Sequence, residues 1–329
     1  MSDAKGTGRG GGIERAVTEN ELEESLACRA AWLHYVGGLT QAAVAKRLGL
    51  PSVKTHRLIA RAVASGVVKV SIDGDIIECV ELEAELCRRF HLDHCEVAPD
   101  LGEEGIPLRA LGQAGAGFLR REIERGDHRT IGLSHGRTLT SAVAHMSRIA
   151  AGQMRFVSLL GVLTRNYAVN PHDVMHSIAE KTGAQAYVMP VPFFANSAED
   201  KAVLLAQRGI SDVLAMANGA ELKVVGIGSV DADAQLVSSG MMHPQEIRDI
   251  KAEGGVGEML GYFFDAQGRV LENPLTARTL GVALNGRADD HVVGIAGGAH
   301  KLEAIRAVLL SGRLRGLITD EATARALLG

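Results

Sequence analysis

The sequence predicts an α/β protein of two domains: an N-terminal winged helix-turn-helix and a C-terminal domain built on a mainly parallel sheet. Three observations support this. The chain has 329 residues, too many for one ordinary hydrophobic core. Two short helical patterns separated by a tight turn lie near the N-terminus. From about residue 94, strand-like apolar runs alternate with helical runs, an order that gives a parallel sheet covered by helices.

The two N-terminal helices are expected to be well delimited. Thr40 can cap the first of them, over residues 41–48, and Gly49-Leu50 provides the turn. Pro51 suits the first turn of the second helix, where its missing N–H costs no hydrogen bond. A capped helix over residues 18–36 precedes the pair. The segment therefore supplies three helices.

The charge of this segment indicates a polyanionic partner. Residues 25–72 hold seven Lys or Arg and no Asp or Glu, whereas the chain carries −4 overall, so the rest sums to −11 (−4 minus +7). An acid-free segment on an acidic chain is an electrostatic footprint for nucleic acid. We therefore expect the second helix of the pair to enter the major groove of double-stranded operator DNA.

The side chains of the two helices are expected to face the bases, the phosphates or the protein core. Those nearest the base edges would be Ser52, Lys54, Thr55, His56 and Arg57. Those more often on phosphates would be Gln41, Lys46, Arg47 and Arg61. Those facing the core would be Val53, Leu58, Ile59 and Ala62.

A β-hairpin is expected to follow the helices and form the wing. Residues 67–72 alternate as a strand, Asp73-Gly74 is a hairpin turn signal, and residues 76–77 begin the return strand. The hairpin would complete a DNA-binding domain over residues 18–80. The Gly-rich, polar residues 1–17 before it are expected to be a disordered tail.

Strands and helices alternate through residues 81–329, after a charged helical stretch over 81–90. The candidate strands are residues 95–98, 130–133, 155–160, 186–190, 222–227, 259–265, 292–296 and 316–318. The candidate helices are residues 107–125, 137–149, 171–182, 198–208, 244–253 and 300–311. Ligands of parallel sheets bind beyond the carboxyl ends of the strands, so the loops there are the candidate sites.

One such loop, residues 132–138, runs from a strand into a helix N-terminus. Backbone N–H groups and the helix dipole favour an anion there, and Ser134, Arg137 and Thr138 would add donors. A tight turn with a capped helix explains the same residues equally well. The spacing fits neither a Rossmann nor a Walker A motif.

Two further strand ends carry suitable groups. Lys301 follows Gly297-Gly298 in the first turn of a helix, where a cation opposes the helix dipole and so favours a bound anion. Glu258 could accept sugar hydroxyls, and Asn166 and Asn170 could do similar work. The complete set of effector-site candidates is Gly132, Ser134, His135, Gly136, Arg137, Thr138, Asn166, Asn170, Glu258 and Lys301.

Several classes of protein are not expected. No apolar run reaches the roughly 18 residues of a membrane span, and the N-terminus lacks the apolar core of a signal peptide. The four cysteines have no metal-ligand spacing, and the histidines are scattered. We therefore expect a cytoplasmic protein with reduced thiols, no metal and no cofactor.

Four motifs resemble those of the SorC family of bacterial transcription regulators. They are IGLSHGRTL (131–139), VGIGSV (225–230), GGVGEMLGYFFDAQG (254–268), and residues 295–328, which join a glycine pair, a lysine, a helix and LITDE. The resemblance covers nearly everything after residue 20. The sequence of residues 38–62 is most similar to that of the erythritol-catabolism regulators of the family. The chain departs from the family pattern at His135, where an aromatic residue is usual, and over residues 51–58.

The resemblance implies a C-terminal domain of the NagB/RpiA-like fold, over residues 81–329, that binds an effector and oligomerises. It implies a homotetramer or homodimer that responds to a sugar, a polyol or its phosphate. The family's phosphate contacts fall on residues 134–138 and Lys301, and its hydroxyl-binding acid falls on Glu258. We accordingly expect a regulator of a carbohydrate or polyol catabolic operon, a repressor rather than an activator.

Two alternatives remain open from the sequence. One is a sugar-phosphate isomerase or deaminase on the same scaffold, since fold alone does not decide function. The other is a DNA-binding scaffold whose α/β domain binds no ligand. The sequence presents no paired acid and base in one loop, so we expect no catalytic residues and no enzyme.

Overall fold

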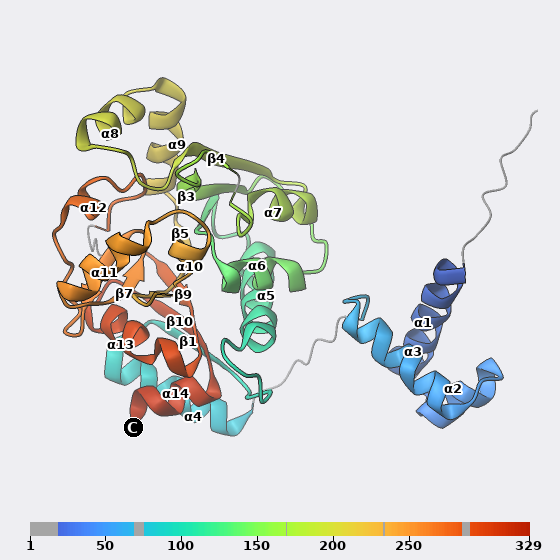
Figure 1. Cartoon of the computed structure of the whole chain (residues 1–329). Helices are drawn as coiled ribbons and strands as arrows, with labels where there is room; N and C mark the ends of the chain where they lie inside the picture. Colours follow the sequence, from blue (N-terminus) through green and yellow to red (C-terminus); the bar gives the residue numbers. More distant parts are fainter. Residues whose placement is uncertain (1–18, 69–75, 169, 233, 285–289) are drawn as a thin grey trace, which may run out of the picture. The chain divides into compact units, whose positions relative to one another are not determined.

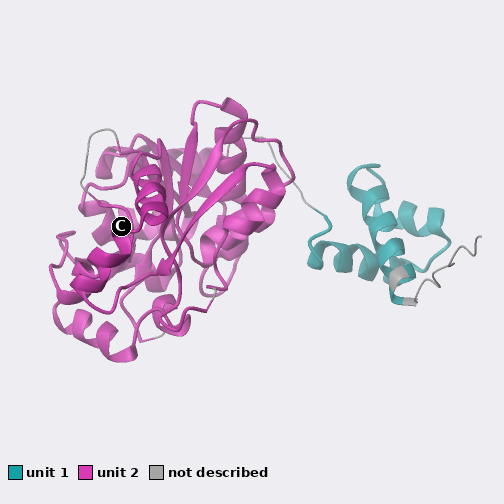
Figure 2. Cartoon of the chain, turned by 90° about the horizontal axis from the view of Figure 1, so that it is seen from above, with its two compact units in different colours: residues 1–73 teal, residues 74–329 magenta. Residues whose placement is uncertain are grey.

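A computed structural model describes residues 19–68, 76–168, 170–232, 234–284 and 290–329. The chain divides into two compact units, Met1–Asp73 and Gly74–Gly329 (Figure 2). The expected boundary after residue 80 therefore lies within the second unit. The expected disordered tail lies outside the described residues.

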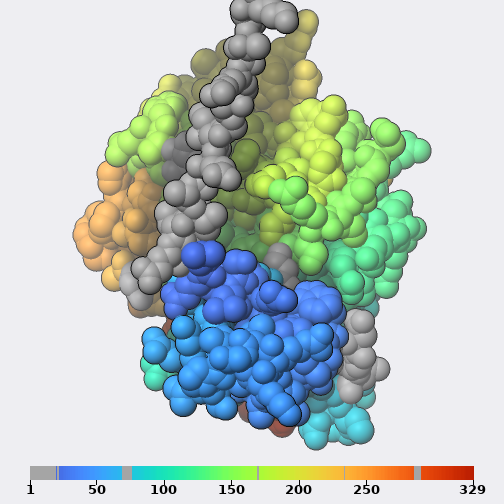
Figure 3. Space-filling view, turned by 90° about the vertical axis from the view of Figure 1, so that its right-hand side faces the viewer, coloured from blue at the N-terminus to red at the C-terminus, as the bar shows by residue number. Residues whose placement is uncertain are grey.

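Three helices form the first unit: α1 (Glu19–Tyr35), α2 (Gln41–Leu48) and α3 (Ser52–Ala64). The Thr40 hydroxyl caps α2 by accepting the Ala43 N–H at 3.2 Å, and Gly49 ends it with φ of 65°. The space-filling view shows the first unit in blue (Figure 3). A small aliphatic core holds its three helices together. Its buried members are Ala27, Ala30, Ala31, Leu33, Val44, Leu58, Ile59 and Ala62. The predicted helix pair is confirmed.

The expected wing is only partly within the described residues. Residues 69–75 lie outside them, and Val67 and Val68 form no strand. The predicted return strand at 76–77 is wrong, because Ile77 begins helix α4 (Ile77–Phe90). Cys79, Leu82, Leu86 and Phe90 repeat at helical spacing and are buried in the core of the second unit. The burial of this helical stripe outweighs the strand propensity of the β-branched Ile76 and Ile77.

A seven-stranded, entirely parallel sheet forms the centre of the second unit (Figure 1). Its order is β1-β10-β9-β5-β2-β3-β4. The bounds are β1 His94–Ala98, β2 Thr130–Leu133, β3 Arg155–Leu163, β4 Gln185–Pro192, β5 Leu222–Gly226, β9 Val292–Ile295 and β10 Gly316–Asp320. The central strands are almost entirely apolar because helices cover both of their faces.

Helices divide between the two faces of this sheet. On one face, the buried core joins the strands to α5 (Leu108–Arg125), α6 (Arg137–His145) and α7 (Met175–Thr182). On the other face, it joins them to α4, α9 (Arg208–Asn218), α13 (Leu302–Leu310) and α14 (Glu321–Leu328). The predicted α/β class is confirmed, although α9 and α14 were not expected.

A second, antiparallel sheet was also not expected. It consists of β6 (Gly228–Ser229), β7 (Gly255–Met259) and β8 (Tyr262–Asp265). The single strand predicted over 259–265 is wrong, because Leu260 and Gly261 turn the chain between β7 and β8 with φ of 55° and 79°. The short helices that remain are α8 Ala198–Leu205, α10 Gln235–Ser238, α11 Pro244–Ala252, α12 Pro274–Ala277 and the 3-10 turn η1 Ala299–Lys301.

The strand order reverses between β2 and β5. From β2 the chain moves outward to β3 and β4, and then returns to place β5 on the other side of β2. Ser134 joins the two strand ends, since its N–H donates to the Val224 carbonyl and its hydroxyl accepts the Gly226 N–H, at 3.0 and 3.1 Å. Loops diverge at such a switch point and leave space for a ligand.

Candidate functional site

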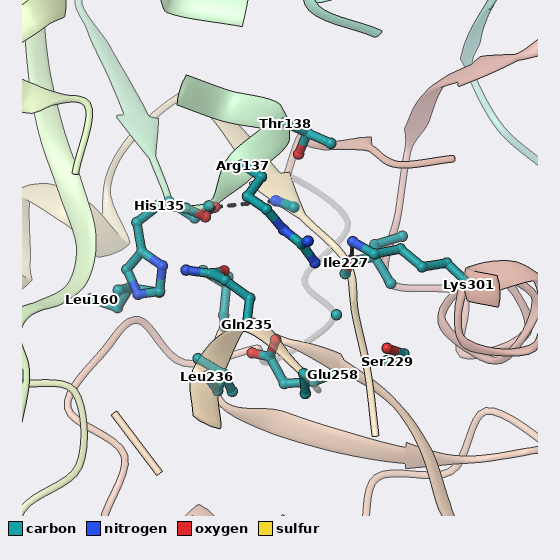
Figure 4. A pocket seen from close by; sticks show the side chains of 16 residues that line it. His135, Arg137, Thr138, Leu160, Ile227, Ser229, Gln235, Leu236, Glu258 and Lys301 are labelled. Carbon is teal, nitrogen blue, oxygen red and sulfur yellow. Dashed lines mark hydrogen bonds between the residues drawn. The ribbon is translucent and has the colours of Figure 1, made fainter. Parts of the chain in front are cut away.

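A pocket opens at this switch point. Six segments of the second unit supply its walls: the loop after β2, Leu160 of β3, the end of β5 with β6, α10, β7 with the β7–β8 turn, and Lys301 after β9 (Figure 4). Its lining residues are Ser134, His135, Gly136, Arg137, Thr138, Leu160, Gly226, Ile227, Gly228, Ser229, Ala234, Gln235, Leu236, Glu258, Leu260 and Lys301. Polar and charged groups therefore meet where a parallel sheet is expected to bind its ligand.

Arg137 is the first residue of α6 and lines the pocket. Gly136 precedes it with φ of 128°, a conformation that favours glycine and lets the chain turn directly from β2 into the helix. The Arg137 side chain is half-buried and has no hydrogen-bond or ion-pair partner among the described residues. A guanidinium at a helix N-terminus without an acidic partner is suited to an anion.

Lys301 reaches the pocket from η1 and is only 8% exposed. Its Nζ donates to the Ile227 carbonyl at 2.7 Å. Burial lowers the pKa of Lys301 to about 8, Arg137 acts in the same direction, and Glu258 opposes them. The glycine pair before it does not line the pocket, and the Asp320 carboxylate occupies the space beside Gly297.

Glu258 lies on β7 and is 9% exposed. Its Oε1 accepts the Gly261 N–H at 2.7 Å from the β7–β8 turn. Burial raises the pKa of Glu258 to about 7, against the opposing effects of that N–H and of Lys301. Its Oε2 lies 2.8 Å from the position of a Cβ on residue 228, so a larger residue there would have to displace the carboxylate.

The pocket thus combines two cationic side chains, one carboxyl group and several polar donors. The cations suit an anionic group, and a carboxyl with a pKa near 7 suits ligand hydroxyls as either donor or acceptor. Thr138 and Ser229 add hydroxyls, while Leu160, Leu236 and Leu260 offer apolar contact to carbon atoms. A small polyhydroxylated anion fits this arrangement of groups.

Most of the predicted effector residues meet in this pocket, but three do not line it. Gly132 is buried within β2, where a Cβ would stand 2.3 Å from the Leu159 side chain. Asn166 is exposed. Asn170 is buried in the loop after β3, where its Oδ1 accepts the His172 N–H at 3.0 Å. These three residues serve packing, surface and turn roles in the described structure.

Sequence reasoning missed Gln235 and Ser229, which also line the pocket. The VGIGSV motif contains Ser229 and could have identified it. Gln235 lies on the four-residue helix α10, which is too short to show a periodic pattern. Nothing in the local sequence links α10 to the loop after β2.

The predicted DNA-facing residues of the first unit have mixed outcomes. Ser52, Lys54, His56 and Arg57 are exposed on α3, and Gln41, Lys46 and Arg47 are exposed on α2. Thr55 is a correction: it is fully buried, and its hydroxyl donates to the Pro51 carbonyl at 3.2 Å. Val53 takes the opposite place and is 74% exposed. Thr55, not Val53, lies on the apolar stripe with Leu58, Ile59 and Ala62.

Arg61 and His56 make contacts within the first unit. Arg61 pairs with Glu23 at 2.5 Å and donates to the Asn20 side chain at 2.8 Å, which ties α3 to α1. His56 Nδ1 lies 3.1 Å from Gln41 Oε1 and joins α3 to α2. A phosphate contact of Arg61 would therefore have to compete with Glu23.

Two negative findings concern the described residues. Within them, no three His, Cys, Asp or Glu side chains come together in a group that could hold a metal ion. None of their helices has the length and apolar composition that crossing a membrane requires. The four cysteines carry free thiols.

Comparison with known proteins shows what the chain is similar to. The model of a sugar-binding domain family matches residues 74–329. The sequence is 65% identical to the erythritol catabolism regulatory protein EryD of Brucella abortus, over 94% of this chain and 98% of that protein. It is 36% identical to the transcriptional regulator LsrR of Klebsiella pneumoniae, over 96% and 98% of the two chains. Full-length SorC, the sorbitol operon regulator of K. pneumoniae, matches with a TM-score of 0.67 at 25% identity, over 93% and 99% of the chains.

These relatives bear on one of the alternatives that the sequence left open, the enzyme. They align with both units of the chain and are named as regulators, so an isomerase or deaminase on this scaffold is not supported. The pocket at the switch point lies within the region that matches the sugar-binding domain family. The chain belongs to the SorC family of sugar-binding transcriptional regulators.

Proposed function

We propose that the protein represses a polyol or carbohydrate catabolic operon and that a phosphorylated sugar or polyol controls its binding to operator DNA. One observation carries the choice of effector: Arg137 and Lys301 face the same pocket as Glu258, and only Glu258 is acidic among its lining residues. Two cations with one carboxyl group favour a ligand that has both an anionic group and hydroxyls. The name of the 65% identical relative makes a four-carbon polyol the first candidate.

The DNA contact belongs to the first unit. The exposed side chains of α3 that can reach base edges are Ser52, Lys54, His56 and Arg57, and those of α2 that can reach phosphates are Gln41, Lys46 and Arg47. A homodimer or homotetramer would place two such helices on a palindromic operator. Effector and DNA would each favour one arrangement of subunits, so that each changes the affinity of the other.

The test is a titration of the full-length protein onto the DNA upstream of the neighbouring operon. We expect tight binding that weakens steeply with salt, and a change in Kd on addition of erythritol 4-phosphate but not of inorganic phosphate alone. Lys301→Met should keep DNA binding and lose the response. If erythritol, erythritol 4-phosphate and a panel of pentose and hexose phosphates all leave the Kd unchanged, the proposal is wrong.

A further inference from the structure

Two neighbouring side chains of the pocket have buried nitrogen atoms without a hydrogen-bond partner among the described residues. Among the described residues, neither ring nitrogen of His135 nor the amide nitrogen of Gln235 has one. Both residues line the pocket, and the Gln235 amide points toward the His135 ring (Figure 4). Buried polar groups are nearly always paired, because removing them from water without a partner costs free energy. Two such exceptions in one pocket indicate a ligand that pairs with both.

The surroundings of His135 show what it can bind. Its ring packs edge-on against Phe193, with centroids 5.4 Å apart and planes at 81°. Burial lowers the pKa of His135 to about 4, so the ring is neutral at pH 7. A neutral imidazole offers one N–H donor and one acceptor. That pair of functions suits a hydroxyl group, which can also donate and accept.

Gln235 and Glu258 extend the same set of partners. The Gln235 Oε1 lies 3.4 Å from the position of a Cβ on residue 136, so the amide lies against the glycine turn before α6. Glu258 uses Oε1 for the Gly261 N–H, and its Oε2 has no hydrogen-bond partner among the described residues. An imidazole, an amide and one carboxylate oxygen are therefore available together. Several hydroxyls on adjacent carbons would satisfy all three.

We propose that Gln235 and His135 form a hydroxyl-binding subsite that selects ligands with adjacent free hydroxyls, beside an anion subsite formed by Arg137 and Lys301. In Figure 4, Arg137 and Lys301 approach one side of the pocket, and His135 and Gln235 lie at the other. This inference rests on the proposed function, since it assumes a polyol or sugar phosphate as the effector. It assigns specificity to Gln235, which no sequence motif indicated.

The test compares two phosphate monoesters of the same chain length by calorimetry on the full chain. Erythritol 4-phosphate has adjacent hydroxyls, and butane-1,4-diol monophosphate lacks the two internal ones. We expect the wild type to bind the first roughly ten- to a hundredfold more tightly, the effect of one or two good hydrogen bonds. Gln235→Leu should remove most of this discrimination and leave the affinity for inorganic phosphate unchanged.

Two further variants sharpen the test. Gln245→Leu makes the same chemical change on the exposed face of α11 and should behave as wild type. His135→Phe keeps a ring against Phe193 and removes both nitrogens, so it should lower the discrimination between the two phosphate monoesters. It provides the same test if Gln235→Leu does not fold. Without ligand, Gln235→Leu should unfold at the same or a higher temperature than wild type, because an unpaired buried amide is lost.

The outcomes separate this inference from the proposed function. If the wild type discriminates and Gln235→Leu and His135→Phe discriminate equally well, the subsite is wrong while the proposed effector class stands. A ligand-free Gln235→Leu that unfolds at a clearly lower temperature would assign Gln235 a structural role instead. If no probe binds the wild type, the effector class is wrong and the subsite with it.

Discussion

Glu258 is a buried acid whose pKa differs from its unfolded value, and the sign of that difference sets a pH dependence. Its pKa is about 7 in the folded chain and 4.5 in the reference state. Between these values the folded chain binds the proton more tightly than the unfolded chain does, so stability falls as the pH rises from about 4.5 to 7. Above pH 7 the cost of the buried charge is fully present.

Glu258→Gln should therefore stabilise the ligand-free protein at pH 8. The gain is at most about 3.5 kcal/mol, from 2.5 pKa units at about 1.4 kcal/mol each, and it should vanish near pH 4.5. Urea unfolding at several pH values, with no effector present, measures it. A variant that is less stable than wild type at pH 8 would show that Glu258 is paired well enough to offset its burial.

Lys301 predicts a second pH dependence, this time of ligand binding. With a pKa of about 8 before the ligand binds, Lys301 is charged below pH 8 and must take up a proton above it. Below about pH 7, Lys301 stays charged and should add little to the pH dependence of the affinity for a phosphate monoester, whereas Glu258 titrates in that range. Above pH 8 the affinity should fall by up to about tenfold per pH unit, since each ligand then binds together with one proton.

Lys301→Arg is the control for this titration, because a guanidinium stays charged throughout the range. The fall above pH 8 should be absent from the variant, whatever its affinity at pH 7. Calorimetry in buffers of different ionisation enthalpy counts the protons taken up. A fall that persists in Lys301→Arg would assign the titration to another group.

At the level of elements, α3 separates the exposed side chains that we propose to read DNA from the buried ones that hold the helix in place. Arg57 is exposed and Thr55 is buried on the opposite face. Arg57→Ala should weaken specific DNA binding by roughly 1–3 kcal/mol, the value of one base contact. Thr55→Val keeps the shape of the side chain and loses its bond to Pro51, so it should lower the free energy of unfolding by about 0.5–1.5 kcal/mol.

Fluorescence anisotropy on an operator duplex should give Thr55→Val the same Kd as wild type at temperatures where both are folded, and Arg57→Ala a higher Kd. Thermal unfolding should show the reverse: a lower melting temperature for Thr55→Val and little change for Arg57→Ala. If Thr55→Val loses specific binding while Arg57→Ala retains it, the orientation of α3 on DNA proposed above is wrong.

The sequence predicted the elements whose determinants are local. Strand β2 is four buried residues between polar flanks, and α2 has its Thr40 cap and its Gly49 stop within ten residues. The positions of Thr55 and Val53 were interchanged because hydrophobicity was weighed above helical spacing. Residues 55, 58, 59 and 62 follow the i, i+3, i+4, i+7 rule, and residue 53 does not. Helical spacing alone therefore places Thr55 in the core and Val53 at the surface.

Features that depend on long-range contacts could not be predicted in this way. The β7–β8 turn uses Leu260 with positive φ, where the common hairpin signal would be Asn-Gly. Gln235 meets the loop after β2 only because α10 returns to the switch point, about a hundred residues further along the chain. Arg137 and Lys301 could be singled out because each stands in the first turn of a helix after a strand, and Glu258 because it stands next to an apolar run.

At the scale of the whole molecule, two sites in different compact units must communicate if the protein is an effector-controlled regulator. The α2–α3 surface lies in the unit ending at Asp73, and the pocket lies in the unit beginning at Gly74. Thermodynamic linkage makes their coupling reciprocal. An effector that weakens operator binding by a given factor must itself be bound more weakly, by the same factor, when the operator is present.

We expect this factor to be about 5- to 150-fold, the usual range of allosteric coupling. The measurement pairs the Kd for an operator duplex with and without saturating erythritol 4-phosphate, and the Kd for erythritol 4-phosphate with and without saturating duplex. Arg57→Ala should keep the effector Kd of the free protein, since Arg57 lies outside the unit that holds the pocket. Lys301→Met should keep the DNA Kd of the free protein. Coupling that persists in Lys301→Met would mean that the probe acts on DNA binding by a route other than this pocket, and factors of one in both directions would leave the α/β unit without control over α3.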